Sequence, residues 1–287
     1  MERKVYVRSF ARISLRHPDP DYTGMFPVME ARRLSRLMKR ALAVSQQALS
    51  EGGIAVPDAI ISGTGLGCIE NTEQFLRPLL GLSDAPLRPT HFMQSTHNTI
   101  SSLIAIKLHC HGYNATYSQG GVSFESALLD AFIQLRLGTI GNALVGAFEE
   151  MTPDFAAMLE KTGWTGVRSE DGRLSETAVA LLLTTSPENA CCELADIRLG
   201  ASAHTSCLAP TELSCPAPTE LSCPAPTGHL TRADYVPLYG DNFCVSALGA
   251  CDAVERLAAG ASGSVILEND FHGKSCATLI LKSLCGR

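Results

Sequence analysis

The segment from Tyr113 to Leu137 constrains the fold more than any other part of the sequence. It indicates a strand over 113–118, a glycine turn and a helix over 124–137 that is apolar on nearly all sides. A helix without a polar face has to be covered on most sides. Ser123 can cap the start of this helix and Gly138 can end it. The segment therefore predicts a layered α/β fold with a buried central helix.

The rest of the chain alternates short apolar runs with helical stretches. The run 178–185 is continuously apolar, as expected of a strand buried on both faces. A long helix is predicted over 27–53, where Pro27 suits the first turn and Gly53 closes the end. Further strands are predicted over 4–10, 58–64, 142–148, 263–269 and 276–283, and a further helix over 241–260.

Composition narrows the functional classes. The net charge of −6 argues against general nucleic-acid binding, which needs a basic surface. No apolar run approaches the roughly 18 residues of a spanning helix, and the first ten residues lack the apolar core of a signal peptide. The eleven cysteines include no CxxC pair, so neither a disulfide framework nor a metal site is indicated. We expect a cytoplasmic protein without a metal or cofactor.

A tandem repeat of period eight interrupts the second half of the sequence. Its units start at Ser206, Ser214 and Ser222 and read SCLAPTEL, SCPAPTEL and SCPAPTGH. Proline and small residues predominate, which is typical of a linker, and the cysteines of the units have no neighbouring acid or histidine at ligand spacing. The repeat thus predicts a Pro-rich linker over 201–238 between two parts of the chain, residues 1–200 and 239–287, which the family resemblance described below identifies as an N-terminal half and a remnant of a C-terminal half. Removing one unit should cost little stability.

Two local motifs have ordinary explanations. The stretch SGTGLG (62–67) has Cys68 where a dinucleotide-binding loop would have its last glycine, so a tight strand-to-helix turn is the better interpretation. A basic run falls within the predicted helix 27–53, and such a run is most often a solvated face. Its members are Arg32, Arg33, Arg36, Lys39 and Arg40.

The motifs, in their order along the chain, resemble the β-ketoacyl synthases, the thiolase-fold enzymes that condense acyl chains. The similarity covers about 1–200 and 240–283, and within the family the sequence is most similar to the ketosynthase-like proteins of aryl-polyene clusters and to chain-length factors. The stretches that carry it are EARRLSRLMKRAL, SGTGLGCIE, STHNTISSLIAIKLHCHGYNATYSQGGVSFESALLDAFIQL, NALVGAFEEMTPDF, FCVSALGACDAVERLAAG and ENDFHGKSCATLILK. The resemblance implies a thiolase-like layered α/β fold with a shortened second half.

The residues expected at the catalytic positions of that family are missing. The nucleophilic cysteine of the family stands at the strand-to-helix turn, and its position falls on Gly121. Ser246 stands where one catalytic histidine would be, and the segment of the other histidine is replaced by the repeat. A glycine cannot attack a thioester, so the resemblance does not extend to condensation activity, and no catalytic residue is assigned.

Three functions stay open at this point. The first is a non-catalytic subunit that pairs, as a hetero- or homodimer, with an active ketosynthase in fatty-acid or polyketide-type (aryl polyene) biosynthesis. The second is an acyltransferase or decarboxylase that acts on carrier-bound thioesters without the cysteine, and the third is a role outside acyl chemistry. Candidate pocket residues are Ser118, Gln119, Ser123, Phe124 and His272. The basic run is a candidate docking surface for an acidic acyl carrier protein.

Overall fold

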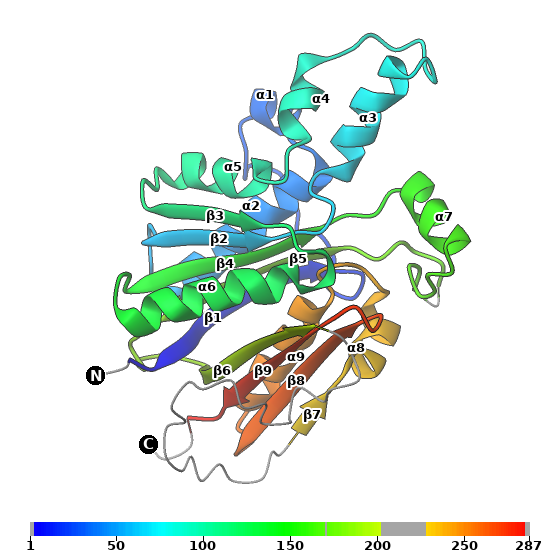
Figure 1. Ribbon diagram of the computed structural model, residues 1–287. Helices are drawn as coiled ribbons and strands as arrows, with labels where there is room; N and C mark the ends of the chain where they lie inside the picture. The colour runs from blue at the N-terminus through cyan, green and yellow to red at the C-terminus, as the bar shows by residue number, and fades with distance from the viewer. Residues whose placement is uncertain (1–2, 170, 202–227, 285–287) are drawn as a thin grey trace.

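The computed structural model describes residues 3–169, 171–201 and 228–284 (Figure 1). The repeat at 206–227, and with it the prediction that one unit is dispensable, lies outside the described residues. No helix within the described ranges is long and apolar enough to cross a membrane.

Nine strands form one mixed sheet in the order β3-β2-β4-β5-β1-β6-β9-β8-β7. The predicted strands all exist. The strand predicted over 4–10 ends four residues later and the strand predicted over 263–269 two residues later, whereas every other predicted bound differs by at most one residue. The strands are β1 (Val5–Ser14), β2 (Ala59–Gly63), β3 (Tyr113–Tyr117), β4 (Asn142–Glu149), β5 (Thr177–Thr184), β6 (Cys192–Ala201), β7 (Gly228–Leu230), β8 (Ser264–Phe271) and β9 (Ser275–Lys282).

The sheet consists of two halves with the same pairing pattern. In the first half β1 pairs antiparallel with β5, β5 antiparallel with β4, β4 parallel with β2, and β2 parallel with β3. In the second half β6, β9, β8 and β7 repeat the first three of these pairings. The halves join where Val5–Val7 of β1 pair with Cys192–Leu194 of β6. Within the described residues the second half is therefore one strand shorter, as predicted.

Helices cover both faces of the first half and the inner face of the second. The helices of the described residues are α1 (Val28–Ala31), α2 (Arg36–Gly52), α3 (Ile69–Leu79), α4 (Pro89–Gln94), α5 (Thr99–Leu108), η1 (Gly120–Val122), α6 (Ser123–Leu137), α7 (Pro153–Lys161), α8 (Arg232–Tyr239) and α9 (Ser246–Ala258), of which α3, α4 and α7 project from the sheet (Figure 1). Helices α2 and α5 pack on the outer face of the first half, where a cluster that includes Leu37, Met38 and Leu182 is buried.

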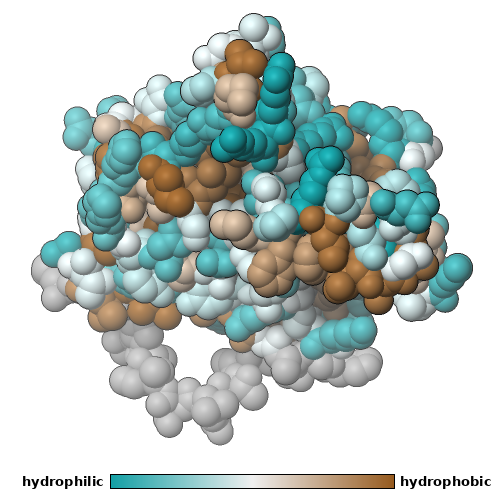
Figure 2. All heavy atoms as spheres, turned by 90° about the horizontal axis from the view of Figure 1, so that it is seen from above, coloured by the Kyte–Doolittle hydropathy of each residue, from teal (hydrophilic) through white to brown (hydrophobic). Residues whose placement is uncertain are grey.

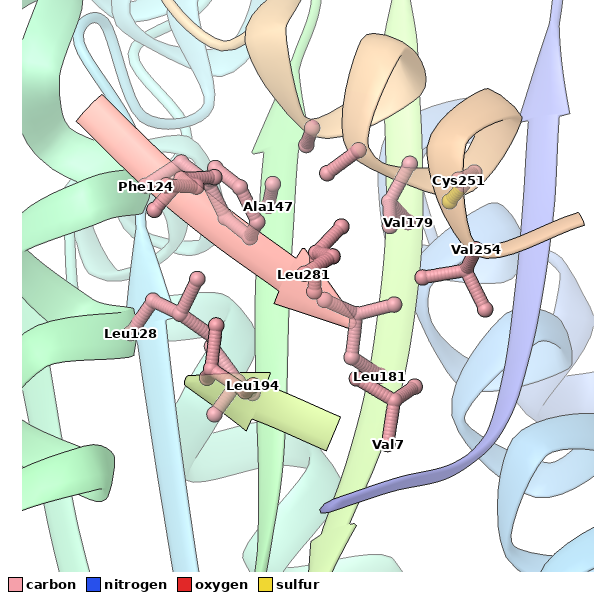
Figure 3. Close-up of a cluster of buried hydrophobic side chains, with 14 of the residues drawn as sticks. Val7, Phe124, Leu128, Ala147, Val179, Leu181, Leu194, Cys251, Val254 and Leu281 are labelled. Atoms are coloured by element: carbon pink, nitrogen blue, oxygen red, sulfur yellow. The ribbon is translucent and has the colours of Figure 1, made fainter. Parts of the chain in front are cut away.

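The central layer is formed by α6 and α9. Helix α6 contacts β2 and β4 of the first half and β6 of the second, and α9 contacts β8 as well as β1 and β5. Their side chains share one buried cluster, in which Phe124 and Leu128 of α6 and Cys251 and Val254 of α9 converge on the strands (Figure 3). The predicted central helix is confirmed, although its last two turns keep an exposed side at Ile133 and elsewhere.

Three predicted boundaries are wrong. The helix predicted over 27–53 is two helices, because the Ser35 hydroxyl accepts a hydrogen bond from the Met38 N–H and starts α2 there. The predicted linker ends too late, since β7 and α8 fold at 228–239 and pack on β8. The predicted N-terminal half ends too late as well, because β6 belongs by its pairing to the second half.

Candidate functional site

The candidate site lies at the carboxyl ends of three parallel strands. Strands β3, β2 and β4 run in the same direction, so the segments that follow them meet at one edge of the sheet. These segments are the turn at 118–122, the turn at 64–68 and the pair Glu149–Glu150. The second half adds the start of α9 and the tip of the β8–β9 hairpin.

Hydrogen bonds of two serine hydroxyl groups, from Ser123 and Ser126, stabilise the turn after β3. It forms the 3-10 helix η1, and Gly120 has a φ of 59°. The Ser123 hydroxyl donates to the Gly120 carbonyl at 2.6 Å and accepts from the Gln119 N–H at 2.9 Å. Ser126 Oγ donates to Gln119 Oε1 at 2.5 Å. Ser123 is thus the first residue of α6 and not its N-cap. Its hydroxyl nevertheless makes hydrogen bonds within the turn, as expected of a capping serine.

The space above Gly121 is filled by an aromatic ring. A Cβ atom built on Gly121 would lie 1.9 Å from ring atoms of Phe271, which is far inside van der Waals contact. Phe271 belongs to an aromatic cluster that also contains Phe243, Trp164 and His272, with ring centroids 4.7–5.4 Å apart. We call these four residues the aromatic plug. The position expected for a nucleophile is therefore both empty of a side chain and covered.

Asp241 binds two members of the aromatic plug, Trp164 and His272. Its carboxylate is buried and accepts from Trp164 Nε1 at 2.8 Å, and it lies 3.2 Å from His272 Nε2. Arg232 pairs with the other oxygen of the same carboxylate. His272 itself has a φ of 51°, which is uncommon for a residue other than glycine. One buried carboxylate thus holds a strained hairpin tip in place.

A buried polar cluster lies beneath the plug. Asn269 Nδ2 lies 2.7 Å from both the Gly121 carbonyl and Glu125 Oε1, and Arg232 Nη1 donates to Asn269 Oδ1 at 2.8 Å. Burial raises the pKa of Glu125. Ser246 Oγ and the Glu125 carboxylate are both buried, and the Ser246 hydroxyl partly offsets the effect of burial on the Glu125 pKa. The region around Gly121 and Ser246, the two positions that lack the family's catalytic residues, is thus polar but buried.

The turn at 64–68 binds a carboxylate of the protein itself. Glu149 accepts from the Gly65 N–H at 2.6 Å and from the Leu66 N–H at 3.0 Å. Burial raises the pKa of Glu149 to about 8 and that of the neighbouring Glu150 to about 7. The N–H groups that a nucleotide phosphate would need are used by Glu149, which agrees with the tight-turn interpretation.

The remaining candidate pocket residues differ in how far they are buried. Phe124 is fully buried in the central layer, whereas Ser118 and Gln119 are exposed at the turn. Ser123 is also fully buried. His272 contacts a different set of residues, since it lies against Asp241 and Trp164.

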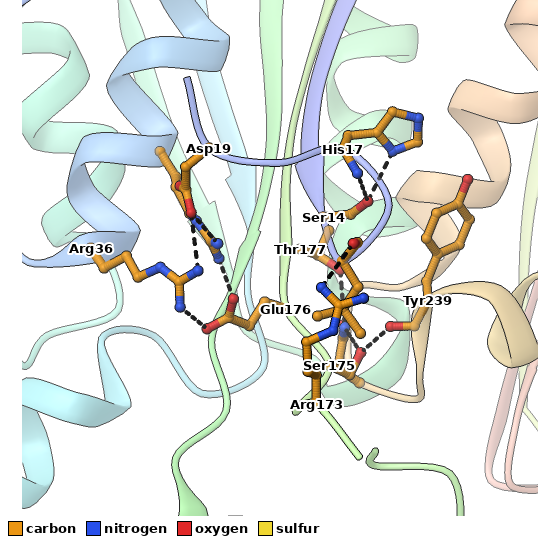
Figure 4. A network of polar contacts seen from close by, with 12 residues as sticks. Ser14, His17, Asp19, Arg36, Arg173, Ser175, Glu176, Thr177 and Tyr239 are labelled. Carbon is orange, nitrogen blue, oxygen red and sulfur yellow. Dashed lines mark hydrogen bonds and ion pairs between the residues drawn. The ribbon is translucent and has the colours of Figure 1, made fainter. Parts of the chain in front are cut away.

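The basic run does not form one exposed surface. Arg40 is buried, and its guanidinium lies 2.6 Å and 2.7 Å from the two oxygens of Asp19 and also pairs with Glu176. Arg36 bridges the same two acids at 3.0 Å and 3.3 Å (Figure 4). Arg40 holds the pKa of Asp19 well below its usual value. Including Arg40 in a docking surface was wrong. Arg32 and Arg33, outside α2, are exposed, and no ion pair with Asp19 or Glu176 is found for them.

Sequence reasoning missed the residues that close the site. Phe271 and Asn269 come from β8, Asp241 and Phe243 from the segment before α9, and Trp164 from the segment after α7. Trp164 is the single tryptophan of the chain, which was a usable signal. The contact between Phe271 and Gly121 joins residues far apart in the sequence and could not be read from local pattern.

Comparison with known proteins supports this architecture. The family model of the β-ketoacyl synthase N-terminal domain matches residues 11–225. No curated protein sequence matches the chain.

Several solved structures share the fold. A type II PKS acyl-carrier protein in complex with its ketosynthase bound to the hexaketide (AntDE:AntF) has a TM-score of 0.76 at 12% identity, covering 99% of this chain and 100% of that chain. The ishigamide ketosynthase/chain length factor has a TM-score of 0.72 at 14% identity, with 99% and 100% coverage. The ketosynthase ApeO in complex with its chain length factor ApeC from Xenorhabdus doucetiae has a TM-score of 0.60 at 16% identity, with 97% and 99% coverage.

Proposed function

The chain belongs to the β-ketoacyl synthase family, and from this premise we propose that it is a non-catalytic, cytoplasmic subunit of that family. It pairs with an active ketosynthase in polyketide- or fatty-acid-type biosynthesis, with aryl polyenes as the product class suggested by the sequence. The thiolase-like fold of the family is present, while Gly121 and Ser246 stand at two positions where groups that bind and activate an acyl thioester would be expected.

One observation carries the proposal. The turn where the family holds its nucleophile has Gly121, and the Phe271 ring occupies the space where a side chain there would project. Ser246, at the position of a catalytic histidine, is buried beneath the plug. A thioester therefore meets neither a nucleophile nor an open path to the start of α6.

A partner chain is favoured by an exposed apolar surface. Strand β3 is the last strand of the sheet, and its outer edge is not paired within the described residues. Most of the exposed large apolar side chains belong to β3, to α1, α3, α4 and α5, and to the loop between α3 and α4, where Figure 2 shows brown patches among teal ones. They are Val28, Met29, Leu76, Leu79, Leu80, Leu82, Leu87, Phe92, Met93, Ile106 and Tyr113. Such a patch beside a free edge is typical of a protein interface.

The fold of this chain indicates what kind of partner would bind at the β3 edge. A chain with the same fold ends its sheet in an equivalent edge strand, so two such edges can pair and extend the sheet while the apolar helices beside them bury each other. Among the solved structures, the ishigamide and Xenorhabdus doucetiae examples are described as a ketosynthase with its chain length factor. This arrangement supports a ketosynthase as the partner of the present chain.

An acyltransferase or decarboxylase is the alternative function. It would rely on Ser123, Ser118 or Gln119. The Ser123 hydroxyl is buried and donates to the Gly120 carbonyl, so it is not available as a nucleophile in this structure. A carrier protein can still visit the complex, and the exposed Arg32 and Arg33 are the members of the basic run suited to an acidic carrier, with an attraction that salt would weaken.

The test combines the chain with a ketosynthase encoded beside it. We expect co-purification as a complex of defined mass in solution, and no turnover of malonyl or acyl thioesters by the chain alone. Ile106→Asp, on the apolar face and 68% exposed, should abolish the complex, whereas Met158→Asp on α7, 54% exposed, should leave it intact. Turnover by the isolated chain, or equal effects of the two variants, would contradict the proposal.

A further inference from the structure

A hollow of about 500 Å³ lies between strand β1, helix α2 and residues 15–27, which we call the β1–α1 loop. Its apolar lining includes Ile13 of β1, Met25 of the loop and Ala43 of α2. The volume falls within the range of small-molecule sites, which is roughly 300–1,000 Å³. The hollow is thus large enough for a small ligand.

The β1–α1 loop is held against α2, so the hollow is preformed. Asp19 of the loop pairs with Arg40 of α2 and accepts a hydrogen bond from the Tyr22 hydroxyl at 2.7 Å. Arg36 of α2 forms a further ion pair with Asp19 at 3.0 Å (Figure 4). Tyr22 and Met25 pack on the buried cluster between α2 and the sheet. Small-molecule sites are usually preformed in this way.

The lining offers no unbalanced charge to a ligand. Arg12 of β1 is the one charged residue that lines the hollow in the described part of the chain. Its Nη1 lies 2.6 Å from Asp252 Oδ1 and its Nη2 lies 2.6 Å from Glu255 Oε2, so two carboxylates of α9 already balance it. A charged ligand would lose hydration here without gaining a counter-charge. The lining therefore favours an uncharged ligand.

Three uncharged polar side chains of α2 line the same hollow. Gln46, Gln47 and Ser50 lie within one turn, at spacings that place Ser50 beside both glutamines. Gln47 Nε2 donates to Glu51 Oε1 at 2.9 Å, which fixes the orientation of its side chain. Glutamine amides and a serine hydroxyl can each donate and accept hydrogen bonds. An amide group, which also does both, is the ligand group that complements this set.

We propose that this hollow binds an uncharged small molecule that carries an amide group on a short apolar chain. The chain lies against Ile13, Met25 and Ala43, and the amide lies at Gln46 and Ser50. The site is independent of the proposed function, because its lining shares no residue with the apolar surface beside β3 or with the aromatic plug.

The experiment is a saturation-transfer NMR titration of the full chain with hexanamide, 1-hexanol, hexanoate and hexylammonium, which share one alkyl chain, at pH 7.5. We expect saturable binding of hexanamide with a Kd on the order of millimolar, as is usual for a ligand of this size. Hexanoate and hexylammonium should bind at least about tenfold more weakly, because they lose hydration without gaining a counter-charge.

Two variants and a matched control place the binding in the hollow. Ser50→Phe fills the hollow from an exposed position and should abolish binding. Gln46→Ala, also at an exposed position, should weaken binding about fivefold, as expected for one neutral hydrogen bond. The control is Gln74→Ala, which removes an exposed glutamine from α3, outside the hollow, and should leave binding unchanged.

Three results would overturn the proposal. They are absence of saturation by hexanamide in the millimolar range, binding of hexanoate, hexylammonium or 1-hexanol as tight as that of hexanamide, and equal losses in Gln46→Ala and Gln74→Ala. Circular dichroism of each variant checks that the fold is retained, and Gln46→Ala carries the test if Ser50→Phe does not fold.

Discussion

Gly121 owes its importance to the ring that lies against it. Its assignment to the nucleophile position came from counting along the motif, and the structure adds that Phe271 occupies the space of any side chain there. The ring comes from a hairpin of the second half, so its role depends on tertiary packing that no local pattern contains. At the residue scale, the sequence identified what is missing from the site but not what replaces it.

Gly121→Cys should be destabilising and should not restore condensation. The new side chain collides with Phe271, and overpacking of this kind costs about 1–3 kcal/mol. Denaturant unfolding measures the loss. The double variant with Phe271→Ala should recover part of it, because the collision is removed. Neither variant should condense acyl thioesters, since Ser246 still replaces the histidine. A Gly121→Cys protein as stable as the wild type would show that the ring moves freely.

Glu149 should make the protein less stable as the pH rises from about 5 to 8. Its pKa is raised from a usual 4.5 to about 8 by burial, so the folded state binds more protons than the unfolded state in this window. The free energy of unfolding therefore falls with pH, by at most about 1.4 kcal/mol per pH unit for this one proton, and levels off above pH 8. Glu149→Gln should flatten the slope measured by urea unfolding at several pH values. An unchanged slope would mean that other groups cause the pH dependence, and Glu150 would be the next residue to test.

At the scale of secondary-structure elements, the pattern of apolar residues predicted which helices and strands exist better than it predicted where they begin and end. Helix α6 was predictable because its apolar residues, which fill most positions, fall on nearly all sides of a helix, and this leaves few alternatives. The break before α2 was missed because Ala31, Leu34 and Met38 keep helical spacing across it. What starts α2 is the side chain of Ser35, and a serine can cap a helix or lie within it, so spacing alone could not decide.

Arg40 should be a structural residue and Arg32 should not, although both belong to the same basic run. Arg40→Ala leaves Asp19 and Glu176 without their buried partner, and breaking such a pair costs about 3–5 kcal/mol. Arg32→Ala, at an exposed position, should stay within about 0.5 kcal/mol. Thermal and denaturant unfolding of the two variants provide the comparison. Similar losses in both would mean that the exposed arginine has a structural contact of its own.

For the whole molecule, the division into two halves was predicted from the repeat, but the halves are not separate bodies. The repeat interrupts the sequence without dividing the core, since one buried cluster includes residues of both halves. Helix α6 of the first half packs on β6, and α9 of the second packs on β1 and β5. Composition shows where a chain changes character, but the pairing of β1 with β6 is a long-range contact that composition does not encode.

A fragment of residues 1–190 should therefore not fold into a stable domain. Without β6 and α9, the inner face of β1 and β5 loses its cover, and Val7, Val179 and Leu181 become exposed to water. Each large apolar side chain left exposed forgoes about 1.5–3 kcal/mol, and several such losses exceed the typical stability of a domain. We expect the fragment to lack a cooperative thermal transition and to aggregate, while the full chain shows a single transition. The matched control adds residues 191–287 as a separate chain, which should restore cooperative unfolding if the packing of β6 and α9 against the first half is what stabilises it. Cooperative unfolding of the fragment alone would instead mean that the first half is an independent domain.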